Sequence, residues 1–258
     1  MLKPDGGERG QGVAVLPDSS AAAAFLGECP KDVIAQKYIP GPEFGVFYCR
    51  YPDTDTGWIF SITEKHLVSV VGDGRRSLEE LILADDRAVC MARFFLAQHR
   101  RHLLEVPQNG ELVRLTQLGT HCRGALFLDG SRHRTPALET AVDRIAKAFA
   151  GFHFGRFDIR APSVEAFREG RDLSVLELNG VTSESTDIYD PSRSIGFAWR
   201  RLMEQWTICF EIAEQNAARG FRPAPVGEIV DRIRRFRHRD LFEAPGPSDT
   251  LPETTAVR

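Results

Sequence analysis

Two short segments near the middle of the chain decide its fold: GRFDIR at residues 155–160 and LSVLELN at residues 173–179. Side chains in a β-strand point alternately to opposite faces, so residues of one parity share a face. In both segments this alternation separates polar from apolar side chains, which predicts two strands that each have one polar and one core-facing side. The polar side carries Arg156, Asp158 and Arg160 of the first segment and Glu177 and Asn179 of the second, while Phe157, Ile159, Leu176 and Leu178 face the core.

If the two strands pair, three oxygen donors converge beside Arg156: the carboxylates of Asp158 and Glu177 and the amide of Asn179. Such a set suits a hard cation such as Mg²⁺, which commonly takes one or two carboxylates and leaves its other positions to water and phosphate. The alternative is a strand pair whose charged face is only solvated, as in many antiparallel sheets.

The composition is that of a globular protein, and it argues against a nucleic-acid or membrane partner, a disulfide framework and a zinc site. The 258 residues allow one large or two modest domains, and 42% are hydrophobic, enough for a sizeable core. The net charge of −3 gives no reason to expect nucleic acid or membrane as a partner. The five cysteines include no CxxC pair, so we expect neither a disulfide framework nor a zinc site. We predict a cytoplasmic protein, and a homodimer is compatible with the sequence.

A glycine-rich stretch lies close to the start of the chain. Four of the seven residues 6–12 are glycine, with Lys3 and Arg9 nearby and an apolar segment, predicted as a strand, at 13–16. Backbone N–H groups of such a loop can approach a phosphate, although no Walker A sequence follows. A flexible hairpin turn is the alternative. Because the loop would normally follow an anchoring strand, we expect further sequence upstream of Met1.

The remaining elements are predicted from the periodicity of apolar residues and from the turn and capping residues between them. Strands are expected at 33–39, 43–49, 58–65, 68–71 and 112–115, and helices at 21–26 (capped by Ser19 or Ser20), 78–83 (capped by Ser77), 85–101, 136–149, 195–218 and 226–239, with residues 245–258 disordered. The helix at 195–218 is expected to turn Leu202, Trp206, Cys209, Phe210 and Ala213 inward. The hydroxyl-rich run 180–187 follows the carboxylates directly and is expected to be a binding loop.

Together these features resemble the ATP-grasp superfamily, over roughly residues 3–187. The chain is most similar to its carboxylate–amine ligases, such as D-alanine–D-alanine ligase and the ATP-grasp region of cyanophycin synthetase. The resemblance is carried by RFD at 156–158 followed by ELN at 177–179, by KPDGG at 3–7, by QKYIPGPEF at 36–44 and by VVGDG at 70–74. These family members have an N-terminal domain ahead of the glycine loop, and the resemblance predicts that this domain is missing here.

The resemblance implies an α+β ATP-grasp fold, with two subdomains and mainly antiparallel sheets enclosing a nucleotide. It divides the chain into a glycine-loop part (1–40), a catalytic core (41–220) and a C-terminal basic helix and tail (221–258). It also implies ATP and Mg²⁺ (or Mn²⁺) as cofactors. The implied site residues are Asp158, Glu177 and Asn179 for the metal; Lys3, Gly6, Gly7, Gly10, Gln36, Lys37, Ile39 and Glu43 for ATP; and Lys65 and Arg156 for catalysis.

The implied activity joins a small-molecule carboxylate to an amine through an acyl phosphate. Taken singly, Glu43 is more typical of a solvated turn carboxylate and Lys65 of a surface residue, so their roles depend on their neighbours. No role follows from spacing for His121 and Arg123. A non-catalytic ATP-binding protein or a fragment of a longer ligase is the alternative, and a phosphotransferase on the same core is a third.

Overall fold

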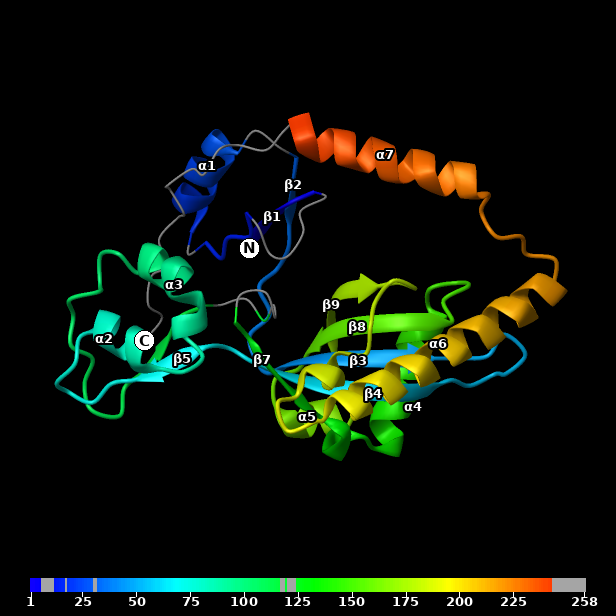
Figure 1. Cartoon of the computed structure of the whole chain (residues 1–258), viewed down its shortest axis with the longest axis horizontal. Helices are drawn as coiled ribbons and strands as arrows, with labels where there is room; N and C mark the ends of the chain where they lie inside the picture. The colour runs from blue at the N-terminus through cyan, green and yellow to red at the C-terminus, as the bar shows by residue number, and fades with distance from the viewer. Residues whose placement is uncertain (6–11, 17, 30–31, 117–118, 120–123, 243–258) are drawn as a thin grey trace.

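The structure is a computed structural model, and it describes residues 1–5, 12–16, 18–29, 32–116, 119 and 124–242, with side chains described up to residue 235. Its centre is a five-stranded antiparallel sheet in the order β7-β4-β3-β8-β9 (Figure 1). The strands are β3 (Glu43–Cys49), β4 (Trp58–His66), β7 (Leu126–Asp129), β8 (Phe154–Arg160) and β9 (Ser174–Asn179).

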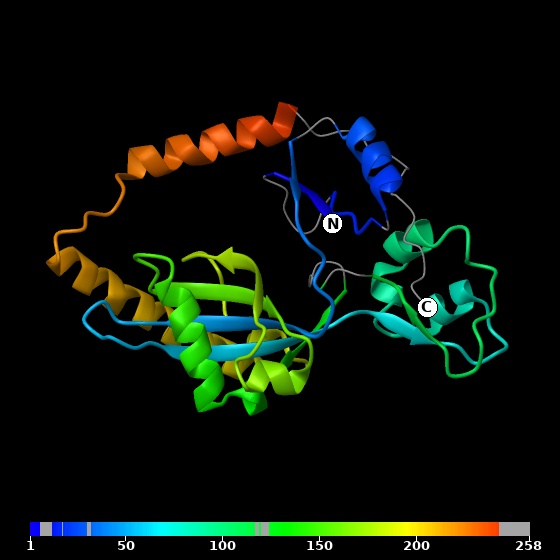
Figure 2. The same ribbon diagram turned by 180° about the vertical axis from the view of Figure 1, so that it is seen from behind.

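The two faces of this sheet are covered differently. One face packs against α4 (Pro136–Lys147) and α5 (Val164–Arg168), which lie in front of the strands in Figure 2. Phe44, Phe157 and Ile159 lie in this core, as the alternation predicts. The other face meets α6 (Ile195–Ala218), where Ile208 and Ile212 pack against apolar residues of β3, β4 and β8. The polar side chains of β8 lie on this second face, beyond the part that α6 covers with apolar residues.

Residues 69–115 build a lobe with a core of its own beside the sheet (Figure 1). It holds β5 (Ser69–Val71), β6 (Leu112–Arg114), α2 (Leu78–Ala84), the 3₁₀ turn η1 (Val89–Met91) and α3 (Ala92–Gln98). The predicted cap of α2 is confirmed, since Ser77 and Glu80 form a reciprocal capping box. The predicted helix over 85–101 is too long. The Asp85 carboxylate accepts the N–H groups of Arg87 and Ala88, and this local bonding replaces the first helical turn.

The chain begins in a small separate sheet of β1 (Leu2–Pro4) and β2 (Val33–Ala35), with α1 (Ser19–Glu28) between them. Asp18 caps α1, not the predicted Ser19 or Ser20. The strand predicted over 33–39 ends at residue 35, and of the strand predicted over 13–16 only a single bridge, from Ala14 to Leu2, is present. At the other end, α7 (Val226–Phe242) stands apart from the body, with every described side chain exposed.

The structure differs from the sequence predictions in further places, each for a physical reason. Strand β7 and helix α5 were not predicted, because four and five residues are too few to show a period. Leu178 is exposed, because β9 is an edge strand. Helix α6 has the predicted bounds, but it buries Gln205, Ile208 and Ile212, and Trp206 and Phe210 of the predicted inward set are exposed. The α+β class with antiparallel sheets is confirmed.

Among the described helices, none combines the length and apolarity that crossing a bilayer requires.

Candidate functional site

The strand pairing on which the predicted site depends is present. In the antiparallel register of β8 and β9, Asp158 lies opposite Glu177, and Arg156 lies opposite Asn179. Directly opposite residues of an antiparallel pair point to the same face, so these four side chains share the face that also carries α6. A one-residue bulge follows at Leu176, next to Ile159, and it does not disturb this part of the register.

A cluster of four charged residues, which we call the charged cluster, occupies the same face: Glu43, Lys65, Asp158 and Arg160. The Lys65 ammonium lies 2.9 Å from Glu43 Oε1 and 2.8 Å from Asp158 Oδ2, and its side chain is only 5% exposed. Arg160 donates to Glu43 Oε2 from Nε at 3.0 Å and pairs with the same oxygen through Nη2 at 2.9 Å. The two carboxylates and the two cations therefore neutralise one another on this face of the sheet.

The Lys65–Asp158 ion pair crosses a strand. Lys65 on β4 and Asp158 on β8 belong to strands that are not neighbours, because β3 runs between them. The β3 residue opposite Asp158 is Gly45, which has no side chain. A Cβ built at Gly45 would lie 3.3 Å from both the Arg156 side chain and the Thr186 hydroxyl. Gly45 thus leaves room for Arg156 and Thr186 beside the charged cluster.

The surroundings keep Lys65 charged. Burial by itself lowers the pKa of this ammonium group, but the attraction of Asp158 and Glu43 outweighs burial, and the net pKa is raised above its ordinary value. Lys65 is thus a buried, fixed positive charge at neutral pH. The described backbone at Gly119 lies against the same cluster, since a Cβ there would be 3.0 Å from Glu43 Oε1.

The segment between β2 and β3, where the adenine hinge was predicted, is tied to the charged cluster. Arg160 donates from Nη1 to the Ile39 carbonyl at 2.6 Å, and its guanidinium lies over the Tyr38 ring, 5.4 Å from the centroid. Gln36 donates from its side chain to the Leu176 carbonyl at 3.2 Å, which reaches the bulge of β9. No role was predicted for Arg160 from the sequence, although its position on the polar face of β8 could have indicated one.

Arg156 links the charged cluster to the loop after β9. Its Nε lies 3.3 Å from Asp158 Oδ1, and its Nη1 donates to the Glu184 carbonyl at 3.0 Å. The side chain is 15% exposed, so the guanidinium lies near the surface of the protein and remains close to Asp158. Its place beside Asp158 is the one that strand alternation predicts, whereas its contact with the loop was not predicted.

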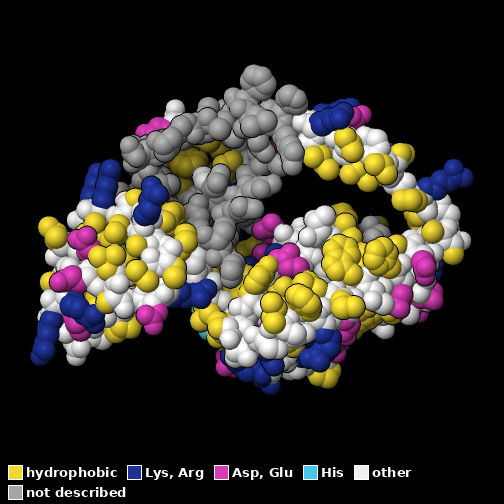
Figure 3. Space-filling model, in the orientation of Figure 1, with side chains coloured by type: hydrophobic (Ala, Val, Ile, Leu, Met, Phe, Trp, Pro, Cys, Tyr) yellow, Lys and Arg dark blue, Asp and Glu magenta, His cyan; other side chains and the backbone are white. Residues whose placement is uncertain are grey.

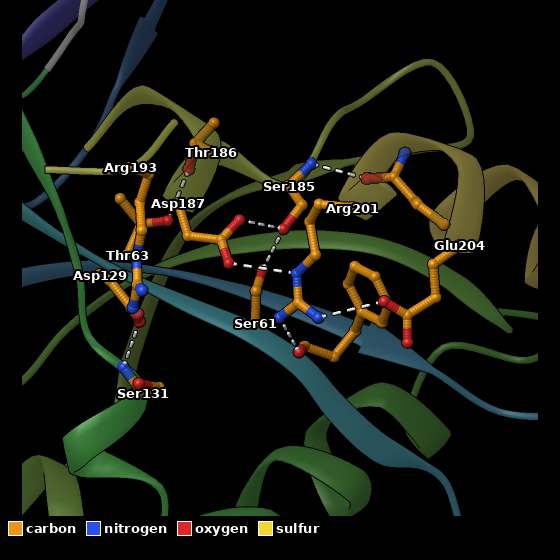
Figure 4. Close-up of polar contacts among 12 residues, drawn as sticks. Ser61, Thr63, Asp129, Ser131, Ser185, Thr186, Asp187, Arg193, Arg201 and Glu204 are labelled. Carbon is orange, nitrogen blue, oxygen red and sulfur yellow. Dashed lines mark hydrogen bonds and ion pairs between the residues drawn. The ribbon is translucent and has the colours of Figure 1, made fainter. Parts of the chain in front are cut away.

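The hydroxyl-rich run 180–187 is mostly an anchored segment, and this corrects the expectation of a free binding loop (Figure 4). Ser185, Thr186 and Asp187 are buried, and only residues 180–182 are exposed. Ser185 Oγ bonds to Ser61 Oγ and to Asp187, both at 2.6 Å, and the Thr186 hydroxyl bonds to that of Thr63 at 2.9 Å. The hydroxyl groups of Ser185 and Thr186 therefore bond to Asp187 and to residues of β4.

Helix α6 also anchors residues 183–187. Gln205 is fully buried; its Oε1 accepts the Ser185 N–H at 2.7 Å and its Nε2 donates to the Ser183 carbonyl at 3.1 Å. Arg201 donates from Nε to Asp187 at 3.2 Å and from Nη2 to the Phe60 carbonyl at 2.8 Å. Burial raises the pKa of the Asp187 carboxyl, with the Ser185 hydroxyl and Arg201 acting in the opposite direction.

Replacing Gln205 with leucine should loosen this segment at little cost to α6 itself. The Ser185 N–H and the Ser183 carbonyl would lose their partners, and each buried unsatisfied group costs about 1–3 kcal/mol. We expect a fall of ~2 kcal/mol or more in the free energy of unfolding, measured by urea titration. Thr207→Val on the exposed side of α6 removes a hydroxyl that bonds only within the helix, and it should change stability by less than ~0.5 kcal/mol. Equal effects of the two substitutions would contradict the anchoring role.

The other predicted site residues lie outside the charged cluster. Lys3 is on β1, opposite Ile34 in the small sheet, and within the described part of the chain it makes no contact with the charged cluster. Lys37 is exposed between β2 and β3. Gly6, Gly7 and Gly10, together with His121 and Arg123, lie outside the described residues, so their roles stay predictions.

The oxygen donors predicted for Mg²⁺ comprise two carboxylates and one amide. Among the described residues there is no group of three or more His, Cys, Asp and Glu side chains placed to hold a metal. Asp158 is engaged by Lys65 and Arg156, whereas Glu177 is exposed and has no ion pair within the described chain. Nδ2 of Asn179 is buried and has no hydrogen-bond partner among the residues that the structure describes. Such a sparse set fits a cation that takes most of its ligands from water and phosphate.

Comparison with known proteins adds little to this description. No family model matches the chain, and no curated protein matches it. Among solved structures it is similar to a bifunctional glutathione synthetase from Pasteurella multocida, with 18% sequence identity and a TM-score of 0.43. That match covers 73% of this chain and 28% of the other, so this chain spans a little over a quarter of its length. The likeness is too slight to bear on function.

Proposed function

We propose that this chain is an ATP- and Mg²⁺-dependent ligase of the ATP-grasp type, joining a carboxylate to an amine through an acyl phosphate. The observation that supports this most is the row formed by Lys65, Asp158 and Glu177 on one face of the sheet. A buried ammonium beside carboxylates, one of them free at the sheet edge, can receive phosphate oxygens and a divalent cation together. Two of the sequence motifs that resemble those of ATP-grasp ligases, at 156–158 and 177–179, contain Asp158 and Glu177.

In the proposed reaction an oxygen of the substrate carboxylate attacks the γ-phosphorus of ATP, and ADP leaves. The amine nitrogen then attacks the carbonyl carbon of the acyl phosphate, loses a proton, and inorganic phosphate leaves. Phosphoryl transfer depends chiefly on positioning and on neutralising the phosphate oxygens. Lys65 offers a fixed positive charge for that purpose, because its raised pKa keeps it protonated.

Mg²⁺ would be held by Asp158, Glu177 and Asn179, and it would supply charge neutralisation at the phosphates. The ion pairs of the charged cluster are compatible with this assignment. Phosphate oxygens would compete with Asp158 for Lys65 and Arg156, which leaves the Asp158 oxygens available. Arg156, beside Asp158 and near the surface, is placed to stabilise the oxyanion of the tetrahedral intermediate, where a preorganised donor can contribute about 3 kcal/mol.

A second function is favoured by one specific observation. Within the described residues, Glu43, Lys65, Asp158 and Arg160 already neutralise one another in pairs, and a structural role for the charged cluster needs no ligand. The chain would then be a non-catalytic nucleotide-binding protein, or part of a longer ligase that acts only when complete.

Titration calorimetry with Mg-ATP, followed by an ADP-release assay against a panel of amino acids, separates these functions. We expect binding and an ADP release that requires both a carboxylate and an amine. Binding without substrate-dependent ADP would favour the non-catalytic protein. A stable phosphorylated product without an amide would indicate a phosphotransferase on the same site, and no Mg-ATP binding at all would overturn the proposal.

A further inference from the structure

Helix α6 carries two apolar stripes on roughly opposite sides. Gln205, Ile208 and Ile212 face the sheet. The second stripe, which we call the outer stripe, is exposed: Trp199, Met203, Trp206, Phe210, Ala213 and Ala217. Its residues follow one another at spacings of four and three, the seam spacing by which one helix packs along another. Trp199 and Phe210 are each 68% exposed, an unusual state for large apolar side chains.

Helix α7 has a matching apolar face and no packing partner within the part of the chain that the structure describes. Val226, Ile229, Val230 and Ile233 lie on one side of it, and all four are exposed. In Figure 3 these apolar side chains lie along α7 beside an open space that separates it from α6. An isolated helix of this length is marginal in water, because most helical stability comes from packing of an apolar face. Both helices therefore lack the same kind of contact.

The connection between the helices lets α7 reach the outer stripe of its own chain. Helix α6 ends in a Schellman cap: Gly220 has φ +90°, its N–H bonds to the Ala217 carbonyl, and the Phe221 N–H bonds to the Asn216 carbonyl. Residues 219–225 then lead to α7, a loop length usual between antiparallel helices. In Figures 1 and 2, α7 already runs back in the direction opposite to α6. At 1.5 Å per residue it is about 25 Å long and fits within the ~36 Å of α6.

Charge distribution favours this pairing over a pairing of two α6 helices. The outer stripe of α6 is bordered on one side by Glu204, Glu211 and Glu214, and the apolar face of α7 is flanked by Arg232 and Arg234. Two copies of α6 would bring this acidic border close to its own copy, whereas α7 brings arginines to it. Complementary charge fixes which helix faces pair more than it adds affinity.

We propose that α7 docks antiparallel onto the outer stripe of α6 in the same chain, forming a helical hairpin that covers Trp206 and Phe210. The hairpin lies on the side of α6 that faces away from the sheet, so the charged cluster and the proposed ligase activity are independent of it. Trp206 reports directly on it, whereas Trp58 lies on β4 against Tyr51 and Trp199 lies beyond the length of a docked α7.

Acrylamide quenching of tryptophan fluorescence in the full chain tests the hairpin. The disrupting variant is Ile229→Gln with Ile233→Gln, on the apolar face of α7. The matched control is Glu228→Gln with Arg235→Gln, which makes two similar changes on the opposite face. We expect the wild type and the control to be quenched equally and the disrupting variant to be quenched more strongly, with light scattering giving a monomer throughout. Equal quenching of all three proteins would overturn the proposal. So would protection that disappears on dilution together with a dimer mass, because a second copy would then be the occupant.

Discussion

Replacing Lys65 with methionine should lower the free energy of unfolding by about 3–5 kcal/mol, the usual cost of removing one partner from a buried ion pair. Methionine preserves most of the length and apolar volume of the lysine side chain, so packing changes little. The charge is what is lost. Glu43 would retain Arg160, but Asp158 would retain only the longer contact with Arg156. Urea denaturation at pH 7 measures the effect.

The matched control is Lys147→Met on α4, which also removes a lysine from an aspartate, Asp143, at 2.7 Å. The Lys147 side chain is 39% exposed, and an ion pair at such a position contributes roughly 0–1 kcal/mol. The double variant Lys65→Met with Asp158→Asn should recover part of the lost stability, since it removes the unpaired charge. A Lys65 variant as stable as the Lys147 variant would contradict a coupled charged cluster.

The part of the site that sequence could predict is the part set by strand alternation. Period two places Arg156, Asp158 and Arg160 on one face whatever the rest of the chain does, and a register that buries Phe157 and Ile159 fixes that face toward α6. The pairing of Asp158 with Glu177 then follows once the two strands are neighbours. Local rules of this kind need no knowledge of distant residues.

Contacts between distant strands could not be predicted in this way. Lys65 meets Asp158 across β3, and no local pattern in the sequence indicates that their two strands flank β3. The burial of residues 185–187 has the same origin, since their partners lie on β4 and α6. On α6 the predicted inward set wrongly included Trp206, Phe210 and Ala213 of the outer stripe, because this side is more apolar than the buried face, which contains Gln205.

Replacing Glu177 with alanine should weaken Mg-ATP binding by ~2 kcal/mol or more, a typical contribution of a contact to a charged group, or about 30-fold in Kd. Glu177 is better suited to this test than Asp158, because it is exposed and makes no ion pair within the described chain. Its removal leaves the charged cluster intact, and we expect stability to change by less than ~0.5 kcal/mol. A loss of binding would then report on the ligand site and not on folding.

The magnesium role makes a sharper prediction than the loss of affinity alone. Lys65 and Arg156 attract phosphate whether or not a metal is present, so ATP in excess chelator should bind the wild type and Glu177→Ala with similar Kd. Only the gain on adding Mg²⁺ should disappear in the variant. Glu169→Ala, an exposed carboxylate at the end of α5 on the opposite face of the sheet, is the control and should keep the full gain. A gain that survives in Glu177→Ala would remove Glu177 from the metal site, and the proposed ligase would then lack one of its two carboxylate ligands.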